Sequence, residues 1–150
     1  MPRILIVDDD PATRRNLRLT LTKHRDWNVS EAENAKTAIE KVRQEQPEIV
    51  LLDVLMSSGN GIMVAYEIRQ VAPKTQIVFI TDKCRPEEAS AVAHLLGSGE
   101  FVDKSQLASH LLPTIKRVLK GSTEEEPLPE SGLLPARPPT LFTKVQKKAG

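Results

Sequence analysis

Ile49-Val50-Leu51-Leu52-Asp53 is a run of four apolar residues that ends in a single carboxylate. The residues that follow at 57–61, Ser-Ser-Gly-Asn-Gly, are typical of a loop. An apolar run of this length with turn residues behind it predicts a central strand buried on both faces. Asp53 would lie at the carboxyl end of that strand, where open α/β sheets place their functional sites. Taken alone, Asp53 could be a metal ligand, a nucleophile, a helix cap or a residue without function.

The composition argues against several classes of function. A net charge of +1 gives the chain no overall basic character of the kind that binds nucleic acid or an anionic membrane, so neither partner is expected. One Trp, one Tyr and three Phe are too few for the stacking platforms that bind single-stranded nucleic acid. The only cysteine, Cys84, excludes an internal disulfide and a cysteine-based metal site, and this usage favours a cytoplasmic location.

The first half of the chain alternates between strand and helix signals. Arg3–Val7 is an apolar run that predicts a buried strand, and Asp10-Pro11 is a typical helix start, with a capping acid before a proline. Asn28–Ala32 predicts a second strand. Asn34 would cap a second helix, which must end before Pro47.

The second half repeats the alternation. We expect a helix over 61–71, a strand over Gln76–Ile80 that ends at Thr81, a helix from Pro86 to Gly97, and a short strand at Phe101-Val102 that ends at Asp103-Lys104. A proline inside a helix removes a hydrogen bond. We therefore expect a short turn near Ser105–Ala108 and a main helix that starts around His110–Leu112, holds Pro113 in its first turn and runs to Lys120.

The β-α unit thus occurs five times in residues 1–120. Right-handed β-α-β connections produce a parallel sheet with helices on both faces. The sequence therefore predicts a doubly wound five-stranded parallel sheet of flavodoxin-like order 2-1-3-4-5. Residues 121–150 are rich in proline and predict a flexible tail.

Polar side chains follow four of the predicted strands, at Asp8-Asp9, Asp53, Thr81 and Lys104. In the predicted strand order these strands are neighbours, so the side chains converge on one edge of the sheet. Clustered carboxylates repel one another unless a cation lies between them, and Mg²⁺ prefers oxygen ligands of this kind. A free Asp53 carboxylate could attack a phosphoryl donor, while Lys104 and Thr81 could bind the new phosphoryl oxygens.

Five segments together resemble the receiver domain of two-component response regulators. They are Ile4-Leu5-Ile6-Val7-Asp8-Asp9-Asp10-Pro11, Leu51-Leu52-Asp53, Gly61, Ile80-Thr81 and Phe101-Val102-Asp103-Lys104. The resemblance implies that residues 1–120 are a receiver domain. It places Asp53 on the phospho-acceptor, and Asp8, Asp9, Asp53 and the backbone carbonyl of Leu55 on the ligands of Mg²⁺.

The resemblance also implies a switch. Thr81 matches the hydroxyl that turns towards the phosphoryl group, Lys104 matches the lysine that pairs with it, and Phe101 matches the aromatic that changes rotamer as Thr81 moves. This shift would alter the face formed by the fourth helix, fifth strand and fifth helix, through which a homodimer could also form. The expected partners are a histidine kinase or phosphotransfer protein and a downstream protein target. The chain would modify only itself and would not be an enzyme for a separate substrate.

Asp82 departs from the family pattern, which has a small residue after the switch hydroxyl. A carboxylate there could repel the phosphoryl group, so the alternative is a degenerate receiver that acts as a phosphorylation-independent interaction module. A Mg²⁺-dependent phosphohydrolase would use a second aspartate two residues after its nucleophile. Leu55 occupies that position and argues against this third reading.

Overall fold

The sheet is parallel and has the predicted strand order. The computed structural model describes residues 1–56, 59–82 and 100–122. Its five-stranded sheet contains β1 (Arg3–Val7), β2 (Asn28–Ala32), β3 (Ile49–Asp53), β6 (Gln76–Thr81) and β7 (Glu100–Asp103) in the order β2-β1-β3-β6-β7. The labels β4 (Leu55–Met56) and β5 (Gly59–Asn60) belong to a separate short antiparallel pair, where the sequence indicated only a loop. Without this pair, the order is the predicted 2-1-3-4-5.

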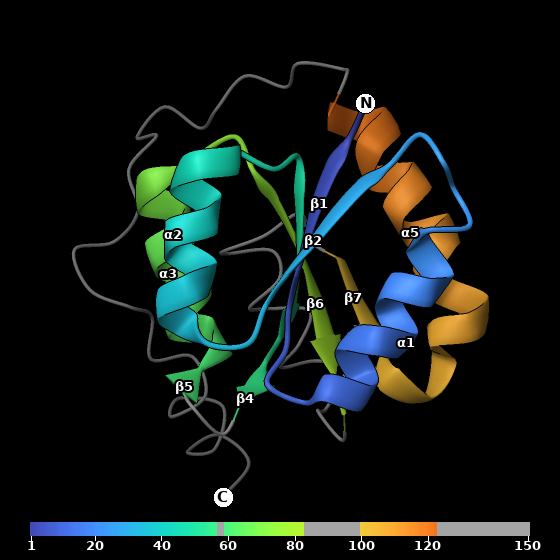
Figure 1. Ribbon diagram of the computed structural model, residues 1–150, viewed down its shortest axis with the longest axis horizontal. Coiled ribbons are helices and arrows are strands. Elements are labelled where there is room, and N and C mark those ends of the chain that lie inside the picture. The colour runs from blue at the N-terminus through green and yellow to red at the C-terminus, as the bar shows by residue number, and fades with distance from the viewer. Residues whose placement is uncertain (57–58, 83–99, 123–150) are drawn as a thin grey trace, which may run out of the picture.

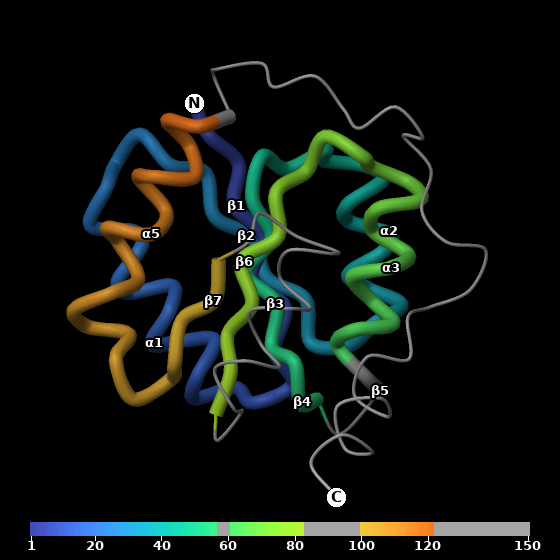
Figure 2. The backbone as a smooth tube through the Cα atoms, turned by 180° about the vertical axis from the view of Figure 1, so that it is seen from behind, coloured from blue at the N-terminus to red at the C-terminus, as the bar shows by residue number. Residues whose placement is uncertain are grey.

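Helices cover both faces of the sheet (Figures 1 and 2). The helices α2 (Ala35–Glu45) and α3 (Gly61–Val71) lie on one face, and α1 (Pro11–Leu21) and α5 (Leu107–Ser122) lie on the other. Alternate residues of each strand therefore enter different cores. Val50, Leu52 and Phe79 pack on the side of α2 and α3, whereas Leu51 and Ile80 pack on the side of α1 and α5.

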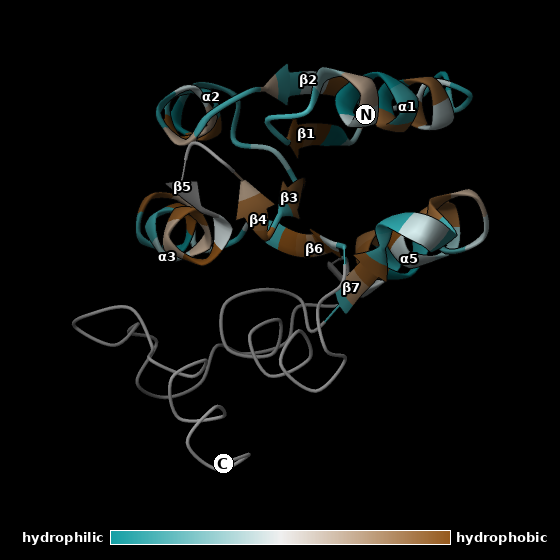
Figure 3. Cartoon of the chain, turned by 90° about the horizontal axis from the view of Figure 1, so that it is seen from below, coloured by the Kyte–Doolittle hydropathy of each residue, from teal (hydrophilic) through white to brown (hydrophobic). Residues whose placement is uncertain are grey.

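The central strand β3 is the most enclosed part of the sheet. Every one of its five residues is buried, including Asp53. It pairs with β1 on one side and β6 on the other, and Figure 3 shows the apolar character of β3 and β6 between polar outer helix surfaces. The sequence prediction of a strand buried on both faces is confirmed.

Helix ends follow the local chemistry that the sequence indicated. Asp10 caps α1 by accepting a hydrogen bond from the Ala12 N–H, and Asn34 caps α2 by accepting one from the Thr37 N–H. The α2 helix ends before Pro47, as predicted, through Gln46 in the left-handed conformation at φ 48°. The Gln46 side-chain amide donates to the carbonyls of Val42 and Arg43 in the last turn of the helix.

The start of α5 was predicted wrongly. A short 3-10 turn, η1 (Lys104–Gln106), leads directly into α5 at Leu107, so Pro113 lies inside the helix and not in its first turn. A proline within a helix costs about 3 kcal/mol. Leu107, Leu111 and Ile115 are buried against the sheet, and each buried side chain of this size contributes about 1.5–3 kcal/mol, which outweighs that cost.

Two predicted segments lie outside the described residues. These are the helix from Pro86 to Gly97 and the tail beyond Ser122; residues 121–122, predicted as the start of the tail, extend α5 past its predicted end at Lys120. Among the helices that the structure describes, none is long and apolar enough to cross a lipid bilayer.

Candidate functional site

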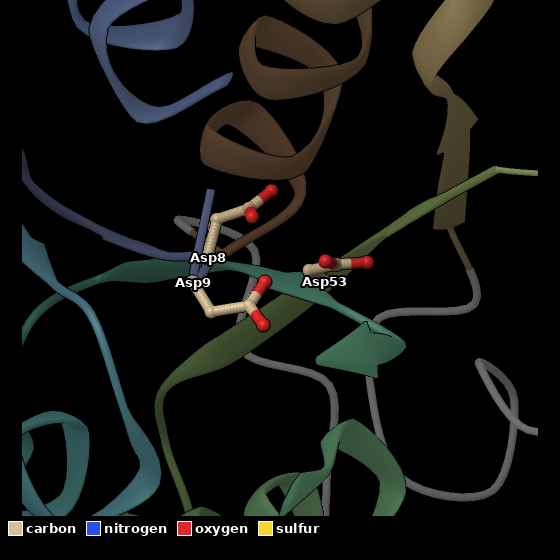
Figure 4. A group of neighbouring side chains, drawn as sticks. All are labelled: Asp8, Asp9 and Asp53. Carbon is tan, nitrogen blue, oxygen red and sulfur yellow. The ribbon is translucent and has the colours of Figure 1, made fainter. Parts of the chain in front are cut away.

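Three carboxylates meet at the carboxyl edge of the sheet (Figure 4). Asp8 and Asp9 directly follow β1, and Asp53 is the last residue of the adjacent strand β3. One carboxylate oxygen from each residue lies within 4.8 Å of the other two. The predicted convergence is therefore present for all three residues.

Asp8 is enclosed far more than an ordinary aspartate. The residue is 1% exposed, and its burial raises the pKa of its carboxyl group, with a further increase from the negative charge of Asp53. The Asp10 N–H donates to Asp8 Oδ1 at 2.9 Å and opposes this rise. Because the pKa of Asp8 is raised overall, its surroundings disfavour the charged form, and the nearby positive charge does not fully offset the effect of burial.

Lys104 brings a positive charge into direct contact with two of these carboxylates. It follows β7, and its Nζ lies 3.2 Å from Asp53 Oδ2 and 3.3 Å from Asp8 Oδ2. Burial lowers the pKa of Lys104, but the charges of Asp53 and Asp8 outweigh burial and the net pKa is raised. The ammonium group is therefore shared between two carboxylates.

The backbone after β3 fixes the orientation of Asp53. The Leu55 N–H donates to Asp53 Oδ1 at 3.1 Å, so Asp53 Oδ2 is the oxygen that meets Lys104. The Val54 N–H donates to the carbonyl of Ile80, which ties this turn to the neighbouring strand. Asp53, at 2% exposure, is thus held in one orientation at the edge of the core.

Gly61 allows α3 to begin against the turn that follows Asp53. A Cβ atom at this position would lie 2.2 Å from the carbonyl oxygen of Asp53 and 2.8 Å from the Cα of Val54. Its N–H donates to the carbonyl of Val54 at 3.1 Å. The sequence identified Gly61 only by resemblance, and the structure gives the physical reason, which is the close approach of two backbones.

Thr81 and Phe101 lie on neighbouring strands. Thr81 ends β6 at 1% exposure, and its Oγ1 has no hydrogen-bond partner among the residues that the structure describes. Phe101 of β7 is half-buried against the core on the α2 and α3 side, and the register pairs it with Phe79. Because strand side chains alternate, Thr81 and Phe101 share a face of the sheet. Asp82 is exposed.

The donor set suits a hard divalent cation. Asp8, Asp9 and Asp53 offer only oxygen atoms, which is the chemistry that Mg²⁺ prefers. Asp8 Oδ2 is buried and, within the described part of the chain, forms an ion pair with Lys104 without accepting a hydrogen bond. The carboxylates therefore fit such a cation. Leu55 is 65% exposed as a residue, and the ligand role of its backbone carbonyl stays a prediction.

One side chain that contacts this edge was missed by the sequence reasoning. Arg14, on α1, donates from its guanidinium to the backbone carbonyl of Asp8 at 2.7 Å and forms an ion pair with Glu31 on β2. Since Glu31 lies on a different element, no local spacing could have connected the two residues.

Comparison with known proteins agrees with this geometry. The family model of the response regulator receiver domain matches residues 4–116. Protein PilH of Pseudomonas aeruginosa is 34% identical over 122 residues, covering 81% of this chain and 100% of PilH. Response regulator MprA of Mycolicibacterium vanbaalenii is 29% identical over 133 residues, but the match spans 88% of this chain and only 56% of MprA.

Solved structures show the same fold. A CheY-like receiver domain protein from Methanospirillum hungatei has a TM-score of 0.75 at 24% identity, covering 84% of this chain and 99% of that one. Response regulator TrrA of Thermotoga maritima, solved in complex with Mg²⁺-BeF, has a TM-score of 0.68 at 30% identity, covering 79% of this chain and 99% of TrrA. With a family model that spans most of its length and a relative above 30% identity, this chain belongs to the response regulator receiver domain family.

Proposed function

We propose that this chain is a phosphorylation-activated switch of a two-component phosphorelay. Asp53 would accept a phosphoryl group from a histidine kinase or phosphotransfer protein in a Mg²⁺-dependent reaction. The observation that carries the proposal is the environment of Asp53, a buried carboxylate with Lys104 Nζ at 3.2 Å and oxygens of Asp8 and Asp9 within 4.8 Å. A carboxylate so placed is held for nucleophilic attack, with the Lys104 ammonium beside it to offset negative charge and with the Asp8 and Asp9 carboxylates available to bind a divalent cation.

The chemical step follows from this arrangement. An Asp53 carboxylate oxygen attacks the phosphorus atom, and the bond between phosphorus and the donor's imidazole nitrogen breaks with its electron pair leaving on that nitrogen. Lys104, already paired with Asp53 Oδ2, stabilises the negative charge of the transferred group. Mg²⁺ held by Asp8, Asp9 and Asp53 would supply positive charge to the phosphoryl oxygens.

Thr81 would convert the new charge into a change of shape. Its buried hydroxyl has no partner among the described residues, so it can donate to a phosphoryl oxygen without breaking an existing hydrogen bond there. Phe101 lies on the same face of the sheet and would change rotamer as Thr81 moves. A local charge would thereby shift the population of two conformations. The altered face would contact a downstream protein or a second copy of the chain.

The main alternative is an interaction module that does not depend on phosphorylation. The exposed Asp82 beside Thr81 is the feature that favours it. The complex of the related TrrA with Mg²⁺-BeF favours the switch. As a switch, the chain would act in the cytoplasm and modify only itself.

Incubation with Mg²⁺ and a small acyl phosphate tests the proposal. We expect intact-protein mass spectrometry to show one added phosphoryl group, which disappears with a chelator or in Asp53→Asn. A Mg²⁺-dependent adduct of equal yield in Asp53→Asn would contradict the assignment of Asp53. No adduct in the parent protein would favour the interaction module.

A further inference from the structure

Arg14 connects α1 to the turn that carries two of the three site carboxylates. Its side chain is 15% exposed and extends back from the helix towards the preceding residues, which is the usual direction for a helical side chain. One guanidinium nitrogen donates to the carbonyl oxygen of Asp8 at 2.7 Å. A charged donor that is partly shielded from water forms a stronger hydrogen bond than a neutral one.

This contact completes the fixation of Asp8. The Asp8 N–H donates to the carbonyl of Ala32 at 3.2 Å, and its Oδ1 accepts from the Asp10 N–H. Arg14 holds the remaining backbone group, the carbonyl oxygen. That carbonyl belongs to the peptide plane that joins Asp8 to Asp9, so holding it also sets the direction in which Asp9 leaves β1.

Glu31 holds Arg14 in turn. Glu31 Oε1 lies 3.4 Å from Arg14 Nε, while Glu31 Oε2 accepts a hydrogen bond from Arg18. Glu31 lies on β2, in register with Ile6 of β1, so the anchor is on the strand that pairs directly with β1. The planar guanidinium can serve the carboxylate and the carbonyl at once because its donors form a fixed fork.

We propose that Arg14 is a positioning residue for the divalent-cation site, acting through the Asp8–Asp9 peptide and anchored by Glu31. The inference rests on the proposed function, in which Asp8, Asp9 and Asp53 hold Mg²⁺. Mg²⁺ requires near-ideal octahedral geometry, so a freed Asp8–Asp9 peptide would weaken binding although every carboxylate remains. Loss of such supporting contacts reduces metal affinity by roughly 10-fold to 100-fold.

Whether Mg²⁺ binding becomes weaker or stronger in an Arg14 variant distinguishes a positioning role from a purely electrostatic effect. Arg14→Met removes a positive charge from the neighbourhood of three carboxylates. Through charge alone, this change would strengthen the binding of a cation. Loss of positioning instead weakens it. Arg15→Met is the matched control, because it removes the same charge from the next residue of α1, whose side chain is exposed.

The test is calorimetric titration of Mg²⁺ alone into the parent protein, Arg14→Met, Arg15→Met and Arg14→Lys. We expect the dissociation constant to rise by at least about 10-fold in Arg14→Met, and to stay unchanged or fall slightly in Arg15→Met. Arg14→Lys keeps the positive charge but loses the planar guanidinium that contacts the Asp8 carbonyl and Glu31 together. We therefore expect an intermediate rise in the dissociation constant. Should Arg14→Met fail to fold, as judged by circular dichroism, Arg14→Lys against Arg15→Met decides.

Three outcomes overturn the inference. They are an unchanged or lower dissociation constant in the Arg14 variants, an equal rise in Arg15→Met, and a parent protein that binds no Mg²⁺. The proposed function fails separately. A parent protein whose Mg²⁺ affinity depends on Arg14 but which forms no adduct on Asp53 contradicts the switch. An adduct on Asp53 with unchanged Mg²⁺ affinity in Arg14→Met contradicts only the role of Arg14.

Discussion

The two edges of the sheet satisfy their buried polar groups differently. At the amino edge, Thr75 is 3% exposed, and its hydroxyl donates to the carbonyl of Pro47 at 2.8 Å. Arg69 donates to the carbonyls of Pro73 and Thr75 at 2.8 and 2.7 Å. At the carboxyl edge, Thr81 Oγ1 and Asp8 Oδ2 are equally buried, and neither has a hydrogen-bond partner among the described residues.

Both edges belong to the same strands, so topology does not explain the difference. Satisfied buried groups stabilise the fold, whereas an unsatisfied buried donor or acceptor costs about 1–3 kcal/mol. Proteins keep such groups where a ligand or reacting group will satisfy them. The hydrogen bonds of the amino edge therefore stabilise the fold. At the carboxyl edge, the described residues leave the Thr81 hydroxyl unpaired, and Asp8 Oδ2 depends on the Lys104 ammonium for compensation.

Lys104→Met should produce the largest loss of stability, because it leaves Asp8 and Asp53 without their shared ammonium. Removing one partner of a buried ion pair costs 3–5 kcal/mol, and partial exposure of Lys104 reduces our expectation to about 2–4 kcal/mol. Mg²⁺ should restore more stability to this variant than to the parent, because the ion replaces the missing charge. Urea unfolding with and without Mg²⁺ measures both effects. Equal stability of the two proteins in Mg²⁺-free buffer would show that Lys104 does not compensate the carboxylates.

Thr75→Val and Thr81→Val apply one substitution to the residue just before β6 and to its last residue. Thr75→Val leaves the buried carbonyl of Pro47 unpaired and should cost about 1–3 kcal/mol, without changing adduct formation on Asp53. Thr81→Val removes a hydroxyl that has no partner in the described structure, so stability should stay equal or increase. Thermal unfolding of the pair measures the contrast. A cost at Thr81 as large as the cost at Thr75 would remove the distinction between the edges.

Asp8→Asn should give the smallest effect, with a sign that depends on pH. Because burial raises the pKa of Asp8 above 3.8, its charged form disfavours folding at neutral pH, and this penalty declines as the pH falls through the raised pKa. Lys104 does not contribute to the change in stability at acidic pH. Its pKa is raised, so the stability that it contributes is lost only at alkaline pH, as the pH rises through that pKa.

In Mg²⁺-free buffer at pH 7, Asp8→Asn should therefore be more stable than the parent by about 0.5–2 kcal/mol. The difference should shrink as the pH is lowered. Saturating Mg²⁺ should reverse it, since the parent then gains a ligand interaction that the variant has lost. Urea unfolding at several pH values tests this sign, and a variant less stable than the parent at neutral pH without Mg²⁺ would contradict it.

The parts of the molecule that could be predicted from the sequence are those encoded by residues close together in the chain. The strand at 49–53 and the caps at Asp10 and Asn34 depend on local patterns, and the site edge follows from the strand order. Other features depend on contacts between distant elements. The start of α5 is decided by burial against the sheet, which overrides the cost of Pro113.

The contact between Arg14 and Glu31 was beyond sequence reasoning for the same reason. It joins a helix to a strand on the far side of a loop, and charged residues on a helix surface are usually solvated. Gly61 was likewise identified only through the resemblance. Its close approach to the backbone of Asp53 and Val54 depends on the tertiary fold, which no local sequence pattern encodes.

Binding of beryllofluoride, which mimics a phosphoryl group on a carboxylate, tests the nature of the carboxyl edge most directly. The measurement is calorimetric titration in the presence and absence of Mg²⁺, with Asp53→Asn as the control. We expect binding to the parent protein only when Mg²⁺ is present, and none to Asp53→Asn. Absence of binding to the parent in saturating Mg²⁺, or equal binding to Asp53→Asn, would contradict the proposal that this edge receives a phosphoryl group on Asp53.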